Sequence, residues 1–280
     1  MITFPNAKIN LGLYITAKRS DGYHNIETIF YPIPLEDALE VNELPTAPAG
    51  SKWVFHATGL PIAGLPEDNL VVKAYQLLDS DYSLPPVEIW LYKRIPSGAG
   101  LGGGSSDAAH MLKMLNDRFA LALTDDELER YAARLGADCP FFVRNKPTLA
   151  TGIGNLFTPV SLSLSGYQLV VIKPDVFVST REAFARIQPR QTGVSIREVI
   201  EHPVETWRHT LSNDFEQSVF AQHPALGVLK EQLYRQGAVY AAMSGSGSAL
   251  FGLFSPDMPC KSLRARFPSP SFYTRLTNRL

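Results

Sequence analysis

Alternating hydrophobic and polar positions near the start of the chain predict a long strand. Apolar side chains recur at every second position from Ala7 to Ile15, with Lys8 and Asn10 on the opposite face. Residues two apart on a strand lie roughly 7 Å apart along it, so Lys8 and Asn10 project side by side. An isolated Lys-x-Asn pair is more often only an exposed strand face, so the pair by itself assigns no function.

The remaining pattern predicts strands and helices in both halves of the chain, and we expect an α+β fold in which a sheet in the second half is covered by helices on one side. A serine-rich stretch suggests a division into domains at residues 1–159 and 160–280. Further strands are predicted at 26–33, 53–56, 87–94, 168–172, 238–243 and 249–254. Helices are predicted at 69–78, 108–119, 124–135, 180–187, 195–202, 213–221 and 224–236, with a helix end and a strand within 264–280.

A glycine-rich stretch follows the strand predicted at 87–94 and runs directly into an apolar helical pattern. Glycine allows positive φ and close approach of a ligand to backbone amides. A loop that ends at a helix N-terminus directs free N–H groups and the positive end of the helix dipole at one point. The sequence therefore predicts a phosphate site, with Ser105 or Ser106 able to cap the helix. The candidate nucleotide-binding residues are Pro96, Ser97, Gly98, Ala99, Gly100, Leu101, Gly102, Gly103, Gly104, Ser105 and Ser106.

Several common phosphate loops are excluded by what surrounds these glycines. Gly98-x-Gly100-x-x-Gly103 fits the dinucleotide pattern, but no second strand ending in an acidic residue follows it. The Gly-Lys-Ser/Thr ending of a Walker A loop is missing, and so are the signature motifs of protein kinases. A flexible linker is disfavoured because a capped amphipathic helix follows at once.

Three other positions suggest chemistry without deciding it. Tyr23 and His24 follow a turn and could stack a ring and bind its edge, although a lone histidine there is more often a surface residue. Asp138 is the single charge in a small apolar segment, where it is either a cap or turn residue or a shielded base. The glycine-serine turn at 244–248 is either a simple hairpin or a second backbone nest.

Composition narrows the class of protein. The 280 residues are 45% hydrophobic and 19% charged, as in an ordinary globular protein. A net charge of −1 disfavours broad nucleic-acid or membrane binding. Two isolated cysteines, Cys139 and Cys260, together with a start that lacks a secretory pattern, suggest a reducing cytoplasm.

Three stretches together resemble the GHMP kinases, which are small-molecule kinases that use ATP. They are Pro5 to Leu11, Pro96 to Ala109 and Met243 to Ser248. The resemblance implies a two-domain fold, with an N-terminal domain similar to domain 2 of ribosomal protein S5, a ferredoxin-like C-terminal domain, and an active site in the cleft between them. It also implies ATP and Mg²⁺.

Residues 21–24 (Asp-Gly-Tyr-His) point within the family to a cytidine diphosphate-linked methylerythritol, phosphorylated on its 2-hydroxyl group. By this resemblance Asp138 is the base, Lys8 its partner and Asn10 a ligand of the alcohol. Tyr23 and Phe184 would stack on the cytosine, and His24 would bind its edge.

The resemblance also implies roles for further residues that match the family motifs less directly. Asn69 and Lys93 would lie near the adenine, Thr180, Gly245 and Ser246 would contact substrate, and Ser106 is a possible metal ligand. Ala249 stands where many relatives have threonine, so contacts from that position are not carried over. The alternatives are a family kinase for mevalonate, homoserine or a sugar, or a non-catalytic nucleotide-binding protein. We expect a monomer or weak homodimer.

Overall fold

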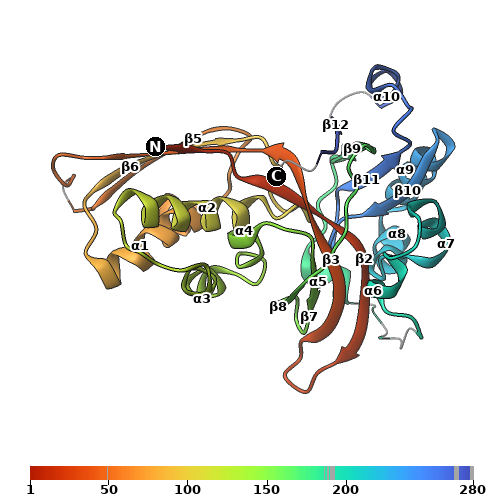
Figure 1. The fold of residues 1–280 in the computed structure, drawn as a ribbon, viewed down its shortest axis with the longest axis horizontal. Coiled ribbons are helices and arrows are strands. Elements are labelled where there is room, and N and C mark those ends of the chain that lie inside the picture. Colours follow the sequence, from red (N-terminus) through yellow and green to blue (C-terminus); the bar gives the residue numbers. More distant parts are fainter. Residues whose placement is uncertain (49, 186, 188, 190–192, 268–270, 278–280) are drawn as a thin grey trace. The chain divides into compact units, whose positions relative to one another are not determined.

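The computed structural model describes the 280 residues except 49, 186, 188, 190–192, 268–270 and 278–280 (Figure 1). The chain forms two compact units, each built from several segments. Unit 1 consists of Met1–Ala7, Leu35–Ser97 and Gly102–Asn145. Unit 2 consists of Lys8–Pro34, Gly98–Leu101 and Lys146–Leu280. The single division expected near residue 160 stays a prediction.

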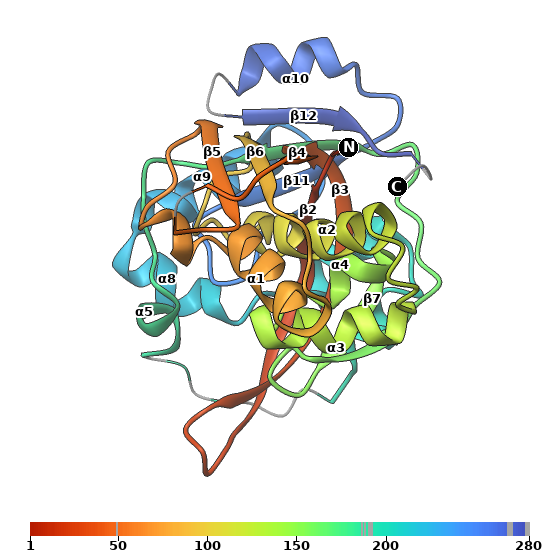
Figure 2. The same cartoon turned by 90° about the vertical axis from the view of Figure 1, so that its left-hand side faces the viewer.

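Unit 1 is a four-stranded sheet with helices on one face (Figures 1 and 2). Its strand order is β1-β4-β6-β5, antiparallel except for the parallel pair β5 and β6. The strands are β1 (Ile2–Thr3), β4 (Ala38–Glu43), β5 (Trp53–Gly59) and β6 (Val87–Lys93). The helices are η1 (Pro66–Asp68), α1 (Leu70–Tyr82), α2 (Gly103–Arg118), α3 (Asp125–Leu135) and α4 (Phe141–Arg144).

Local sequence signals account for these elements. In β6 every second side chain, from Val87 to Lys93, is buried, which is the alternation of a strand with one covered face. Asn69 caps α1, because its side-chain oxygen accepts a hydrogen bond from the Val71 N–H at 3.0 Å. Thr124 and Glu127 form the reciprocal capping box at the start of α3.

Unit 2 contains two further sheets, ordered β2-β3-β7-β8 and β10-β11-β9-β12. The first consists of β2 (Asn6–Lys18), β3 (His24–Glu36), β7 (Thr148–Thr151) and β8 (Leu156–Pro159). The second consists of β9 (Gln168–Ile172), β10 (Ala238–Met243), β11 (Leu250–Phe254) and β12 (Ser271–Arg275), and its pairs are antiparallel. The helices are α5 (Thr180–Phe184), α6 (Ile196–Val199), η2 (Val204–Thr206), α7 (Trp207–Thr210), α8 (Phe215–Gln222), α9 (Pro224–Arg235) and α10 (Cys260–Arg266).

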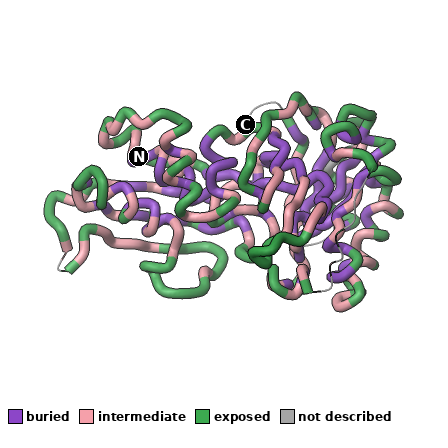
Figure 3. Tube along the Cα trace, turned by 90° about the horizontal axis from the view of Figure 1, so that it is seen from below, coloured by how far each residue is buried: buried purple, intermediate pink, exposed green. Residues whose placement is uncertain are grey.

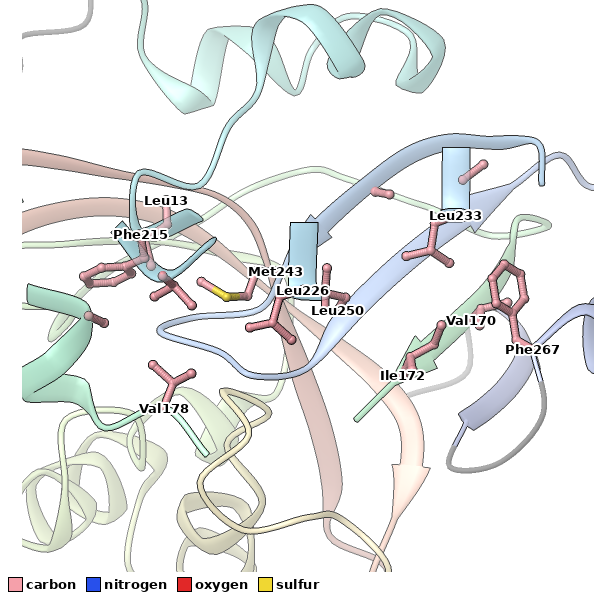
Figure 4. Packing of buried hydrophobic residues seen from close by; sticks show 14 of the residues in the cluster. Leu13, Val170, Ile172, Val178, Phe215, Leu226, Leu233, Met243, Leu250 and Phe267 are labelled. Atoms are coloured by element: carbon pink, nitrogen blue, oxygen red, sulfur yellow. The ribbon is translucent and has the colours of Figure 1, made fainter. Parts of the chain in front are cut away.

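The core of unit 2 lies where helices pack on the second sheet (Figure 4). Leu226 and Leu233 of α9, seven residues apart and therefore on one helix face, are buried with Ile172 of β9 and Leu250 of β11. Buried stretches of the chain are separated by exposed connections, as Figure 3 shows.

The α+β class expected from the sequence is confirmed. The predicted helices at 180–187 and 195–202 are shorter in the structure, as α5 and α6, and residue 186 lies outside the described residues. Residues 268–270 and 278–280 of the predicted closing segment also lie outside them. Throughout the part of the chain that the structure describes, no helix is long and apolar enough to cross a membrane.

Candidate functional site

The glycine loop joins β6 to α2 through backbone conformations that favour glycine. Gly98, Gly100 and Gly102 have φ values of 62°, 77° and 72°. At Gly100 a Cβ atom would also lie 1.9 Å from the carbonyl oxygen of Ser244. The path of the loop therefore depends on glycine both for its dihedral angles and for close packing.

Helix α2 begins earlier than predicted. Its N-cap is Gly102, so the expectation that Ser105 or Ser106 caps the helix is wrong. Glycine takes the left-handed N-cap conformation without steric cost, and the helix starts before the serines are reached. The first N–H groups of α2 have no acceptor within the helix. The free donors on which the predicted phosphate site depends are therefore retained, although the helix starts earlier.

Ser106, the possible metal ligand, lies inside α2 with its side chain fully buried. Its hydroxyl oxygen is 3.3 Å from Nδ1 of His110. Burial lowers the pKa of His110 to about 4, so this histidine is neutral near pH 7. In this structure the Ser106 hydroxyl therefore faces a neutral histidine.

Lys93 is held between two carboxylates. Its Nζ donates to Oδ2 of Asp107 at 2.7 Å and to Oδ2 of Asp37, and its side chain is 4% exposed. Oδ1 of Asp37 accepts hydrogen bonds from the backbone N–H groups of Arg94 (2.5 Å) and Ile95 (2.8 Å). Burial acts to lower the pKa of Lys93, but the attraction of Asp107 and Asp37 raises it above its usual value.

The two residues predicted near the adenine thus have partners within unit 1. Lys93 is engaged by Asp37 and Asp107, and Asn69 caps α1. Their placement near the adenine stays a prediction.

Lys8 and Asn10 lie side by side on β2, as the alternation predicts. Nζ of Lys8 donates to Oδ1 of Asn10 at 2.7 Å, and Nδ2 of Asn10 donates to Oγ1 of Thr28 at 3.0 Å. The Lys8 ammonium also lies 4.5 Å from the ring centre of Phe30. Both side chains are buried, at 3% and 2% exposure, so the alternative of an exposed strand face is wrong.

The turn between β10 and β11 is more than a hairpin connection. The Ser244 hydroxyl donates to the carbonyl oxygen of Gly100 at 2.8 Å, and the Ala249 N–H donates to that of Ala99 at 3.2 Å. Gly245 is buried and Ser246 is half-buried. The turn therefore packs against the glycine loop, so a simple hairpin is not its whole role, and its function as a second backbone nest stays a prediction.

An aromatic cluster lies where the cytosine contacts are predicted. The rings of His24 and Phe184 stack with centres 4.8 Å apart and planes 21° apart, and Phe184 packs edge-on against Phe215. Tyr23 is 62% exposed and Thr180 is exposed. Burial, followed by the nearby Lys18 charge, lowers the pKa of His24 and so favours its neutral form.

Asp138 lies in the turn between α3 and α4 and is half-buried. Pro140, not Asp138, occupies the N-cap of α4, so Asp138 is a turn residue rather than a cap. The adjacent Cys139 is fully buried, which raises the pKa of its thiol to about 11. This thiol is therefore protonated at neutral pH.

Comparison with known proteins decides the family. The family model described as GHMP kinases N terminal domain matches residues 69–146, and the one described as GHMP kinases C terminal matches residues 195–269. A Bacteroides fragilis protein named 4-diphosphocytidyl-2-C-methyl-D-erythritol kinase is 65% identical over 92% of this chain and 93% of its own length. The chain belongs to the GHMP kinase family.

Other relatives agree with this placement of the GHMP kinase. A Cytophaga hutchinsonii protein with the same name is 50% identical over 91% of the chain and 93% of its own length. A crystal structure of 4-(cytidine 5'-diphospho)-2C-methyl-D-erythritol kinase has a TM-score of 0.80, 32% identity and 98% coverage of both chains. A mevalonate kinase structure, with TM-score 0.70, 15% identity and 98% coverage of both chains, shares the fold.

The sequence of this GHMP kinase does not by itself reveal the partners of its buried polar residues. Asp37 and Asp107 on either side of Lys93, and Asn213 beside the 244–248 turn, are defined only by contacts far apart in sequence. A carboxylate in the glycine motif was one available signal for Asp107. The functional roles assigned to individual residues stay predictions.

Proposed function

We propose that this GHMP kinase transfers the γ-phosphoryl group of ATP to the 2-hydroxyl group of 4-diphosphocytidyl-2-C-methyl-D-erythritol, a step of the non-mevalonate isoprenoid pathway. The observation that carries the proposal is the 65% identity, over 92% of the chain, to a relative whose name contains this substrate. Two features of the structure support it. The glycine loop offers backbone N–H groups that suit phosphates, and the His24–Phe184 cluster offers aromatic rings that suit a base.

The backbone of the loop and the start of α2 supply the phosphate-binding groups. Phosphoryl transfer depends mainly on positioning and on stabilising charge, with little covalent help from the protein. Main-chain N–H groups held by glycine geometry can do this without the lysine of a Walker A loop. We assign residues 96–106 to this role.

Asp138 and Lys8 are assigned to the transfer itself. Asp138 takes the proton of the 2-hydroxyl group while that oxygen forms its bond to the γ-phosphorus and the bond from phosphorus to the ADP oxygen breaks. Such base assistance is typically worth about 10²–10⁴-fold in rate. Lys8 provides positive charge, which favours the ionised form of a nearby carboxylate, and Asn10 holds the acceptor alcohol.

The aromatic cluster is assigned to the cytosine. Tyr23 and Phe184 are assigned to stacking on the base, and neutral His24, which has one donor and one acceptor nitrogen, is assigned to the base edge. The His24 ring covers one face of Phe184, so binding against that face requires His24 to turn toward the edge of the base. Thr180, Gly245 and Ser246 are assigned to the remaining substrate contacts.

Mg²⁺ enters as part of the MgATP substrate. Across the described ranges, no three His, Cys, Asp or Glu side chains are grouped so that they could hold a metal ion. Mg²⁺ commonly keeps several waters and binds substrate phosphates with one or two carboxylates. Ser106 does not fit as a ligand in this structure because it is buried against His110, and we derive no step through the ion.

The test is ADP release from MgATP by the purified protein with diphosphocytidyl-methylerythritol, mevalonate and homoserine supplied separately. Turnover with the cytidine compound alone is expected. Turnover with another acceptor would support the kinase activity but refute the assignment of a cytosine-binding pocket. Binding of ATP without turnover of any acceptor would favour the alternative of a non-catalytic nucleotide-binding protein.

We also propose the partners, the location and the oligomeric state of the protein. The net charge of −1 speaks against broad nucleic-acid or membrane binding. We propose a cytoplasmic protein that is a monomer or weak homodimer, which sedimentation over a range of concentrations would test.

A further inference from the structure

The segment Ser212–Asp214, between α7 and α8, is bound to strand β2. The Leu13 N–H donates to the carbonyl oxygen of Ser212 at 2.9 Å, and the Asp214 N–H donates to that of Leu13 at 2.8 Å. The Asp214 carboxylate also accepts from the Ile15 N–H at 2.9 Å. The segment is therefore attached to the strand that carries Lys8 and Asn10.

Within this segment, the Asn213 side chain binds the turn between β10 and β11. Its Nδ2 donates to the carbonyl oxygens of Met243 and Gly245, both at 2.8 Å, and its Oδ1 accepts from the Phe215 N–H at 3.0 Å. The side chain is buried, at 3% exposure. Both amide protons are thus used on two carbonyls of one turn, a pattern that no other side chain of similar size reproduces.

The turn held by Asn213 contacts groups of the proposed site. The Asn10 N–H donates to the Ser244 hydroxyl at 3.3 Å, and that hydroxyl donates to the Gly100 carbonyl at 2.8 Å. A Cβ atom on Gly245 would lie 3.3 Å from Cα of Gly100 and 3.4 Å from Oδ1 of Asn10. Because the packing is this close, a shift of the turn by only a few tenths of an ångström changes its contacts with Asn10 and Gly100.

We propose that Asn213 is a positioning residue for phosphoryl transfer. Its side chain fixes the turn between β10 and β11 relative to Asn10 and the glycine loop. This inference rests on the proposed function for its kinetic consequence, but not for its structural one. Displacing reacting groups by about 1 Å can lower turnover by about 10²-fold. Asn213 acts on the reaction through the turn and is assigned no contact with substrate.

The principal variant is Asn213→Asp, which keeps Oδ1 as an acceptor and the size of the side chain. It replaces two donors with an oxygen that faces two carbonyl oxygens. Asn116→Asp is the matched control, because Asn116 also binds a backbone carbonyl and N–H, both of Leu123, within unit 1. Asn213→Ser, which retains a single donor, provides a milder change if the aspartate variant folds poorly.

Two measurements on the full-length protein decide the proposal. We expect kcat per folded molecule to fall about 10–100-fold in Asn213→Asp and less in Asn213→Ser, with the KM for ATP changed less than about threefold. Asn116→Asp should keep kcat within about twofold. Equal kcat in the Asn213→Asp and Asn116→Asp variants, at matched folded fractions, would overturn the positioning role.

Amide hydrogen exchange provides a readout that needs no turnover. In Asn213→Asp the amides of residues 243–249 should exchange at least about tenfold faster than in wild type, and those of α9 should not change. Unchanged exchange in the turn would overturn the inference even if the enzyme used another acceptor. A wild-type protein that turns over no acceptor would instead refute the proposed function, and hydrogen exchange would still judge the Asn213 contact.

Discussion

Lys93→Met removes the only cation from a buried cluster of three ionisable groups within the described part of unit 1. Nζ of Lys93 bridges the carboxylates of Asp37 and Asp107, and all three side chains are less than 5% exposed. Methionine fills a similar volume but leaves two carboxylates facing each other. Oδ1 of Asp107 already has no hydrogen-bond partner among the described residues, so this carboxylate has little with which to replace the lysine.

The expected loss of stability follows from that burial. Removing one partner of a buried ion pair typically costs about 3–5 kcal/mol, because the remaining charge is left without compensation. At roughly 2–4 °C for each kcal/mol in a chain of this size class, the melting temperature should fall by about 6–20 °C. Uptake of a proton by one carboxylate lessens the penalty, so the loss should be larger at pH 8.5 than at pH 6.

Urea unfolding followed by tryptophan fluorescence and circular dichroism measures this loss, and coincidence of the two transitions tests two-state behaviour. The matched control is Lys73→Met, which breaks an ion pair with Asp68 whose side chains are 43% and 63% exposed and should cost at most about 1 kcal/mol. Adding Asp107→Asn to Lys93→Met should recover about 0.5–3 kcal/mol as coupling. A Lys93→Met variant that loses less than 1 kcal/mol would refute the reasoning.

The remaining predictions concern the reaction and pH. Asp138→Asn should lower kcat by about 10²-fold or more while ATP still binds, and near-normal turnover would remove Asp138 from the mechanism; exposed Asp117→Asn is the control. Tyr23→Ala should weaken binding of the cytidine substrate by about 1–3 kcal/mol, with little effect on the binding of ATP. An unchanged KM for the cytidine substrate would contradict the stacking. Burial, offset in part by Lys93, raises the pKa of Asp107 from 3.8 to about 8. The folded state therefore binds the extra proton, and stability should fall as pH rises between these values; Asp107→Asn should flatten this slope, and an equal slope in both proteins would disprove the assignment.

Local signals predicted much of the fold correctly. The alternation from Ala7 to Ile15 identified β2, and the capping residues Asn69 and Thr124 identified the starts of α1 and α3. These patterns work because strand alternation and helix capping involve residues only a few positions apart. The cap of α2 was predicted three to four residues too late, because Gly102, which has no side chain to signal a cap, takes the N-cap position.

The sequence by itself determined the composition and order of the site: a glycine loop followed by a helix, Lys8 beside Asn10, and a second glycine-serine turn. It did not determine which groups meet. The Lys93–Asp37 contact spans 56 positions and the Ser244–Gly100 contact spans 144. Only the tertiary structure decided that Lys93 lies between the carboxyl groups of two buried aspartates and that the second turn packs on the first loop. The physical reason is that burial and hydrogen-bond partners depend on packing between distant segments, whereas periodicity and capping depend on the local chain.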